Sequence, residues 1–310
     1  MADGPSAQII GSFARRCLRR PGFEGRVLAS LREAIYFSDP RGQLLWLALP
    51  SHPPHRRALL MPFDSFGVSV GSPVSMVGDR LALDGVKESR VDQAAVWSAP
   101  ILDRSRLVPW AALHDHVQAL VERVIEMPGC RGFGQLLGHD LNGRDELRPP
   151  DGADADARRW QAMFVAGRDL LRAGRAGTAA LFEPALELLG LGPGLTPAGD
   201  DLVGGMLFAL NRVARAYPEN VPRATPGRTV LLDRAQAATT RISFAILSDL
   251  AHGHGASPMH DLLQALLYGE EPGRALAAAE AITRIGHTSG WDMLAGVVGG
   301  LSLIVGSAGR

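Results

Sequence analysis

The spacing of hydrophobic residues changes near residue 105. Before that point, short apolar or alternating runs are separated by Pro, Gly, Asp and Ser. Such runs are typical of strands joined by turns. After a short amphipathic helix within residues 1–25, the pattern predicts strands at 25–37, 43–49, 57–61, 68–77, 81–83 and 94–97. Short strands at this spacing indicate a small barrel or sandwich.

Beyond residue 105 the periodicity becomes helical. In 111–127, Leu113, Val117 and Leu120 recur at helical spacing, and Pro128 and Gly129 end the pattern. A charged, glycine-rich loop is predicted at 132–150. Further helices are predicted at 155–173, 177–189, 197–217, 229–251, 259–267, 273–285 and 290–305. The expected fold class is α+β, with a small β-rich N-terminal domain (1–105) followed by a mostly α-helical C-terminal domain (106–310).

Composition narrows the class of protein. Hydrophobic residues make up 46% of the 310, which is enough for a sizeable core. The 32 basic and 32 acidic residues balance, so the charge does not indicate binding to nucleic acid or to an anionic membrane. We find no signal-peptide pattern and no apolar run of membrane-spanning length. Cys17 and Cys130 are too few for a disulfide framework. We expect a soluble, cytoplasmic protein.

A glycine-rich loop at 190–201 lies between two predicted helices. Its sequence is Gly-Leu-Gly-Pro-Gly-Leu-Thr-Pro-Ala-Gly-Asp-Asp. Thr196 is placed to cap the second helix, and Pro197 suits the first helical position. Asp200 and Asp201 then fall in the first turn, where the helix dipole favours negative charge. The loop contains no lysine, so it is not a Walker A phosphate-binding loop.

The pattern of this loop returns near the C-terminus. Residues 194–204 and 286–296 share the template G-x-T-x-x-x-D-x-L-x-G, with every shared position 92 residues apart. The matched pairs are Gly194 and Gly286, Thr196 and Thr288, Asp200 and Asp292, Leu202 and Leu294, and Gly204 and Gly296. Each copy places a Thr and an Asp at the start of a helix. We therefore expect two related loop–helix elements that face each other across one site.

Backbone N–H groups of a glycine-rich loop at a helix N-terminus bind anions. The neighbouring carboxylates would repel an anion unless another group lies between them. Mg²⁺ held by Asp200 and Asp201 is one solution, because it binds carboxylates together with phosphate. The other is a substrate whose amide group donates to the Asp residues while its anionic end contacts the loop. His287, inside the second loop, is a candidate acid, base or anion donor.

Each of these features also has a purely structural interpretation. Ser289 and Asp292 have the spacing of a capping box, and the other Asp residues could simply complement the helix dipole. Glycines in both copies could serve close helix packing. A hydroxyl-rich cluster around Arg241 is predicted in the middle of the helix at 229–251, where the guanidinium could hold an anion or face solvent. That cluster comprises Thr239, Thr240, Arg241 and Ser243.

The two loops resemble the signature stretches of the AllH-like family. The resemblance rests on residues 190–201 and 286–292, together with the hydroxyl cluster at 239–243, and extends over about 184–300. The N-terminal third matches only in its β-rich character. Members of this family, once described either as proteins of unknown function or as carboxylases, are associated with a subunit of oxamate carbamoyltransferase in allantoin (purine) degradation. The resemblance implies that oxalurate and phosphate give oxamate and carbamoyl phosphate, in a complex with other subunits.

From the residues and the resemblance together, we predict an anionic substrate, such as carbamoyl phosphate or oxamate, between the two loops. The expected catalytic residues are Asp200, Asp201, His287 and Asp292. The expected substrate-binding residues are Gly192, Gly194, Thr196, Thr239, Thr240, Arg241, Ser243, Thr288 and Ser289. Two alternatives remain: a carboxylase or ligase-like enzyme, for which we recognise no ATP site in the sequence, and a non-catalytic scaffold or regulatory subunit.

Overall fold

The computed structural model describes residues 6–64, 67–137, 157–174, 178–221 and 225–307. The chain forms two compact units. The first comprises Met1–Pro100 with Gly255–Ser257, and the second comprises Ile101–His254 with Pro258–Arg310. The first unit holds the strands and the second is helical, so the predicted α+β class is confirmed. Residues 138–150 of the predicted loop lie outside the described residues.

The first unit is built on one curled sheet. Its nine described strands follow the order β8-β7-β6-β2-β3-β4-β5-β1-β9. The predicted run at 25–37 is two antiparallel strands, because Arg32 and Glu33 interrupt it at a turn. The strands are β1 (Ile9–Gly11), β2 (Glu24–Ser30), β3 (Ala34–Ser38), β4 (Leu44–Ala48), β5 (Ala58–Leu60), β6 (Pro73–Val77), β7 (Arg80–Leu83), β8 (Val86–Arg90) and β9 (Ala95–Trp97).

The predicted N-terminal helix is shorter than expected. Helix α1 spans Ser12–Leu18, and the residues before it form β1, which pairs with both β5 and β9. Its buried face contributes Ala14, Cys17 and Leu18 to the core of the sheet, where they join Ile35 and Phe37 of β3. Burial raises the pKa of the Cys17 thiol, so this residue packs as a small apolar group.

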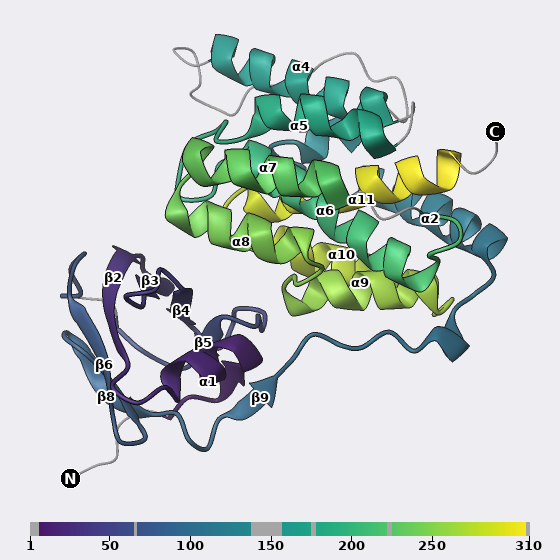
Figure 1. The fold of residues 1–310 in the computed structure, drawn as a ribbon. Coiled ribbons are helices and arrows are strands. Elements are labelled where there is room, and N and C mark those ends of the chain that lie inside the picture. Colours follow the sequence, from purple (N-terminus) through teal and green to yellow (C-terminus); the bar gives the residue numbers. More distant parts are fainter. Residues whose placement is uncertain (1–5, 65–66, 138–156, 175–177, 222–224, 308–310) are drawn as a thin grey trace. The chain divides into compact units, whose positions relative to one another are not determined.

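The second unit is a bundle of helices (Figure 1). They are η1 (Arg104–Arg106), α2 (Trp110–Ile125), α4 (Ala157–Gly174), η2 (Thr178–Leu181), α5 (Phe182–Leu188), α6 (Ala198–Ala216), α7 (Thr225–Ala238), α8 (Arg241–Ala251), α9 (Ser257–Leu267), α10 (Pro272–Thr283) and α11 (Ser289–Ser307). Helices α6 and α11 lie at its centre, and most of their described side chains are buried.

Helices α6 and α11 run parallel in close contact, and glycines make this possible. A Cβ added at Gly205 would lie 2.2 Å from the carbonyl oxygen of Met293, and one at Gly296 would lie 2.0 Å from that of Leu202. Residues in contact therefore differ by 293 − 205 = 88 and 296 − 202 = 94 positions, close to the repeat spacing of 92. The N-termini of both helices, with the repeated loops, consequently lie at the same end of the pair.

The predicted helix at 229–251 was wrong in one respect, because it is two helices. Helix α7 ends at Ala238 and α8 begins at Arg241, with Thr239 and Thr240 between them. The side chain of Thr240 accepts a hydrogen bond from the backbone N–H of Ser243 and so caps α8. Capping by threonine competes with a continuous helix. The hydroxyl cluster thus surrounds a helix start.

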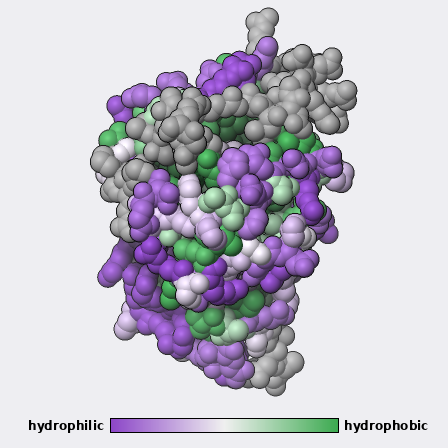
Figure 2. Space-filling view, turned by 90° about the vertical axis from the view of Figure 1, so that its right-hand side faces the viewer, coloured by the Kyte–Doolittle hydropathy of each residue, from purple (hydrophilic) through white to green (hydrophobic). Residues whose placement is uncertain are grey.

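Among the described residues, no helix combines the length and apolar character needed to cross a bilayer. On the face shown in Figure 2, the described side chains are mostly hydrophilic, and hydrophobic ones form small patches between them.

Candidate functional site

The two repeated loops meet at the N-termini of α6 and α11. The hydroxyl groups of Thr196, from the first loop, and Ser289, from the second, lie 2.9 Å apart in hydrogen-bond contact. Both residues are partly buried. The parallel register of the two helices brings the equivalent positions of the repeats together. The expected meeting of the two loops therefore agrees with the geometry of the second unit.

The capping roles predicted for these hydroxyls were wrong. The N-cap of α6 is Pro197, which provides no side-chain cap, and Ser289 is the first residue of α11. Thr196 and Ser289 bond to each other rather than to the ends of their own helices. Sequence could not reveal this contact, because their separation of 93 residues is bridged only by the packing of α6 on α11.

Asp200 is a buried junction between the first loop and the hydroxyl cluster. One carboxylate oxygen accepts a hydrogen bond from the backbone N–H of Gly190, at 2.8 Å. The other accepts from the hydroxyl of Ser243, at 2.6 Å, and from that of Thr239. These three donors explain how a carboxylate with 1% exposure is accommodated. Asp200 holds the loop, the α7–α8 turn and α8 together.

Thr240 provides a second connection between the α7–α8 turn and the first glycine-rich loop. Its hydroxyl donates to the carbonyl oxygen of Leu195, at 2.6 Å, while its oxygen accepts from the backbone N–H of Ser243, at 3.0 Å. Three of the predicted cluster residues, Thr239, Thr240 and Ser243, therefore fix the shape of the glycine-rich loop. In this structure the hydroxyls of all three residues bond to other groups of the chain.

Asp201 is buried and only partly satisfied. Its side chain has 2% exposure, and its Oδ2 has no hydrogen-bond partner. Burial raises the pKa of this carboxyl well above its ordinary value, and the negative charge of Asp292 raises it further. Hydrogen bonding from Ser289 and Thr196 acts in the opposite direction. Burial is the largest cause, so the neutral acid is favoured here.

Asp292 is the equivalent buried carboxyl of the second repeat. It has no exposed surface, its Oδ1 accepts from the backbone N–H of Phe133 at 2.7 Å, and its Oδ2 lacks a partner. Burial raises its pKa to about 7, against the lowering effect of the bonds from Phe133 and Thr288. The backbone N–H of Asp292 donates to the carbonyl oxygen of Thr288 at 3.0 Å and starts α11.

The segment that covers Asp292 was missed from sequence. Gly132 approaches so closely that a Cβ there would lie 2.2 Å from Oδ1 of Asp292, and its φ is +50°. At Gly134 a Cβ would lie 2.7 Å from the ring of Trp291. The only sequence signal was the run of glycines after Pro128, which we assigned to a loop. Gly132–Gly134 is a third wall of the site.

The carboxyls do not fit a Mg²⁺ site as they are arranged here. Mg²⁺ requires ionised oxygen ligands in nearly octahedral geometry. Both oxygens of Asp200 are taken by hydrogen-bond donors, and burial favours the neutral form of Asp201. Among the described residues no three His, Cys, Asp or Glu side chains form a metal-binding group. We assign no metal ligand in this arrangement, and Mg²⁺ stays one of the two predicted ways to bring an anion beside the carboxylates.

The outer edge of the site carries the remaining predicted residues. Gly192 and Gly194 have φ values of +119° and +96°, which favour glycine, and Gly194 is exposed. His287 and Arg241 are also exposed, and neither side chain pairs with another described residue. Arg241 directly follows Thr240, whose hydroxyl donates to the carbonyl oxygen of Leu195, so the backbone of Arg241 lies close to the first loop. The structure thus separates an exposed rim from a buried carboxyl layer.

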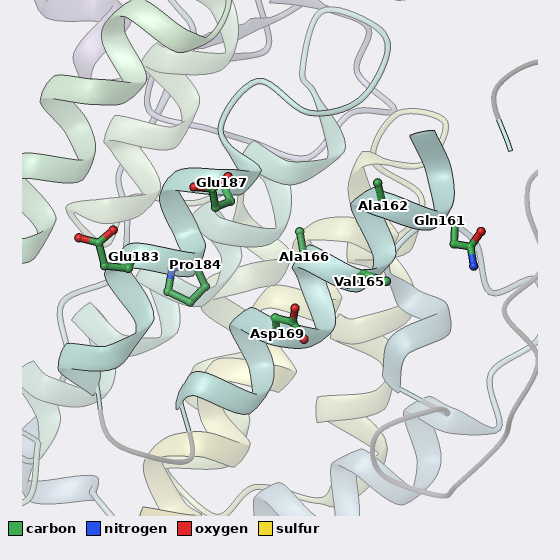
Figure 3. A pocket seen from close by; sticks show the side chains of 8 residues that line it. All are labelled: Gln161, Ala162, Val165, Ala166, Asp169, Glu183, Pro184 and Glu187. Atoms are coloured by element: carbon green, nitrogen blue, oxygen red, sulfur yellow. The ribbon is translucent and has the colours of Figure 1, made fainter. Parts of the chain in front are cut away.

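A groove of about 730 Å³ lies elsewhere in the second unit, between α4 and α5 (Figure 3). None of the predicted site residues lines it. Three carboxylates on its wall form no ion pair within the described chain, so they would repel oxamate or phosphate. They are Asp169, Glu183 and Glu187. This groove does not suit the anionic substrate expected for the paired loops.

Comparison with known proteins supports the resemblance seen in the loops. Residues 188–301 match the family model of the oxamate carbamoyltransferase subunit AllH. The matched range begins just before the first loop and ends within α11, so it contains both repeats and the hydroxyl cluster. The predicted relation to this family is confirmed over that part of the second unit. No solved structure matches the chain.

Proposed function

We propose, from the family match over residues 188–301, that this protein is the AllH-type subunit of an oxamate carbamoyltransferase. The observation that carries the proposal is the meeting of the two repeated helix starts, joined by the contact of Thr196 with Ser289. The loops surrounding this contact would hold the substrate. Oxalurate and phosphate would be converted to oxamate and carbamoyl phosphate.

Two parallel helix N-termini provide a favourable electrostatic setting for anions. Each N-terminus carries roughly half a positive charge from its aligned peptide dipoles, and its first N–H groups lack partners within the helix. Gly192 and Gly194 let the backbone approach a phosphate or carboxylate without side chains in the way. The exposed guanidinium of Arg241 would add a bidentate contact to such a group.

The buried layer would recognise the uncharged end of the substrate. A carbamoyl group offers N–H donors, and the unpartnered carboxyl oxygens of Asp201 and Asp292 are the acceptors in the described site that lack a donor. His287 lies in the second loop, where it would stabilise the oxyanion that develops on the carbamoyl oxygen. The hydroxyl of Thr288, which bonds to Asp292, would hold that carboxyl in place. Asp200 would position the loop through its three hydrogen bonds rather than contact substrate.

The family name describes a subunit, so we propose that activity requires other chains of the same enzyme. Purine or allantoin breakdown is the setting that the resemblance implies, and the cytoplasm is the compartment expected from the composition of the chain. The first test is phosphate-dependent formation of carbamoyl phosphate from oxalurate, with and without Mg²⁺. It uses the purified chain alone and the chain mixed with the proteins encoded beside it.

Variants show whether the paired loops perform the chemistry. We expect Asp292→Asn and Thr196→Val to lower kcat at least 100-fold in the assembled enzyme, while Asp233→Asn, an exposed change on α7, keeps full activity. Circular dichroism checks that each variant is folded. If the mixture is inactive with a panel of carbamoyl acceptors, the transferase proposal fails. If Asp292→Asn keeps full turnover but weakens assembly, the scaffold alternative is correct.

A further inference from the structure

The first unit contains a cavity of its own, with a volume of about 400 Å³. It lies between α1 and the turn that joins β6 to β7. Cavities that bind small molecules start at roughly 300 Å³ and combine apolar walls with a few charged groups. The apolar wall of this cavity comprises Ile10, Leu18, Met76 and Val91. None of the residues assigned to the paired loops lines it, so it is a separate candidate site.

Helix α1 contributes two arginines to this cavity. Arg15, Leu18 and Arg19 stand at positions i, i+3 and i+4, which share one face of a helix, and all three line the cavity. Leu18 is buried, Arg15 is partly buried and Arg19 is exposed, so this face runs from the apolar wall to solvent. Within the described parts of the chain, neither arginine forms an ion pair with a carboxylate. Two positive charges at the cavity are therefore uncompensated.

Arg20 is a third arginine of the cavity wall, and it is held in place from behind. Its guanidinium donates to Oδ2 of Asp39 at 3.2 Å. Asp39 is buried, and its Oδ1 accepts from the backbone N–H groups of Arg41 and Gln43 at 3.0 and 2.8 Å. A guanidinium has five N–H donors, so Arg20 keeps donors for a ligand while Asp39 fixes its position. Such preorganisation lowers the entropic cost of binding.

The two carboxylates of the cavity are already engaged by Arg90. Its guanidinium lies 3.2 Å from Oδ2 of Asp79 and donates twice to Asp92, at 3.2 and 3.0 Å. The hydrogen bonds from Arg90 lower the pKa of Asp92, so this ion pair persists at neutral pH. Counted with their ion-pair partners, the charged groups of the cavity are four arginines and three aspartates. The excess is positive and lies on α1, which favours an anion there.

We propose that this cavity binds a small organic phosphate monoester. Its phosphate contacts the guanidinium groups of Arg15, Arg19 and Arg20, and its apolar body packs against Leu18 and Met76. Three guanidinium groups suit the three terminal oxygens of a phosphate monoester, which carries a charge of about −1.5 to −2 at pH 7. A carboxylate offers only two oxygens and a single charge. This inference is independent of carbamoyl transfer, because all of these residues belong to the first unit.

The test is a titration of the purified full chain with phenyl phosphate, followed by calorimetry and by NMR of the side-chain methyl groups. Inorganic phosphate and phenylacetate are titrated in parallel. We expect phenyl phosphate to bind at least about 10-fold more tightly than either, because only it provides both the dianion and the apolar body. Equal binding of inorganic phosphate would reduce the cavity to a charged surface, and equal binding of phenylacetate would contradict the choice of phosphate. The methyl signals expected to shift are those of Ile10, Leu18, Met76 and Val91, and unchanged signals there would overturn the proposal.

Variants locate the bound phosphate. Arg15→Gln and Arg19→Gln should each raise the Kd for phenyl phosphate about 10-fold, on the scale of one charge-assisted hydrogen bond. Arg32→Gln, in the exposed turn between β2 and β3, is the matched control and should leave the Kd unchanged. Arg241→Ala, beside the paired loops, should also leave it unchanged. If binding is lost in Arg241→Ala and kept in Arg15→Gln, the phosphate binds at the paired loops and the inference is wrong.

Discussion

The hydroxyl groups of Thr196 and Ser289 lie 2.9 Å apart although 93 residues separate them in the chain. Each belongs to one copy of a repeated loop–helix element. Their contact follows from the parallel packing of α6 and α11, whose residues contact each other at nearly the spacing of the repeat. The two copies of the repeat therefore lie together and form one site, not two.

The close crossing of these helices should tolerate no side chain at its glycines. We expect Gly296→Ala to lower the free energy of unfolding by about 1–3 kcal/mol or more, because its Cβ would lie 2.0 Å from the carbonyl oxygen of Leu202. Urea titration measures this. Gly273→Ala, at an exposed position of α10 where an added Cβ meets no atom within 4 Å, is the control and should be neutral or up to about 1 kcal/mol stabilising.

Removing the charge of Asp200 should loosen the loop. Asp200→Asn replaces one of the two acceptor oxygens with an NH2 group, so the side chain can no longer accept both from Gly190 and from the hydroxyls of Thr239 and Ser243. We expect a loss of about 2–3 kcal/mol in unfolding free energy, the scale of bonds to a charged buried group. Thermal unfolding of the variant beside Asp233→Asn measures it. Equal stability of the two would contradict the role of Asp200 as a junction.

Thr240 should combine a capping effect with a loop contact. Thr240→Ala removes the N-cap of α8 and the bond to Leu195, and we expect a loss of about 1–2 kcal/mol in stability. Thr240→Ser keeps the hydroxyl and should restore most of it. Hydrogen exchange of the Ser243 amide reports the cap directly, and unchanged exchange in the alanine variant would exclude the capping role.

Asp292 should make stability depend on pH. Its pKa in the folded state, about 7, lies above the ordinary 3.8, so the folded protein retains a proton that the unfolded chain releases. This contribution to stability is therefore present below about pH 4 and is lost as pH rises toward 7, with a slope of at most about 1.4 kcal/mol per pH unit. In Asp292→Asn, urea titrations across this range should show a flatter profile.

Arg241 should affect substrate binding more than folding. It is exposed and unpaired within the described chain, so Arg241→Ala should leave thermal stability within about 0.5 kcal/mol of wild type. In the assembled enzyme we expect KM for the anionic substrate to rise about 10-fold, on the scale of one charge-assisted bond. Arg234→Ala, exposed on α7, is the matched control. An unchanged KM would remove Arg241 from the site.

The sequence by itself determined the two classes of secondary structure, the repeat and most helix boundaries. Period-2 and period-3.6 patterns are local, because they reflect which face of each element is buried. It also singled out Asp200 and Asp292, since a carboxyl at a fixed position in a repeated helix start is visible without any contact.

Only the tertiary structure decided what these groups do. The break at Thr239 and Thr240 was hidden because threonine is tolerated inside helices although it favours caps, and the loop beside it decides between the two. Likewise, Asp200 is saturated with donors, whereas Asp201 and Asp292 keep unpaired oxygens. Gly132 and Phe133 were visible only as part of a glycine-rich stretch, which did not show that they lie against Asp292. Burial and hydrogen-bond partners arise from long-range packing, which the order of residues alone does not display.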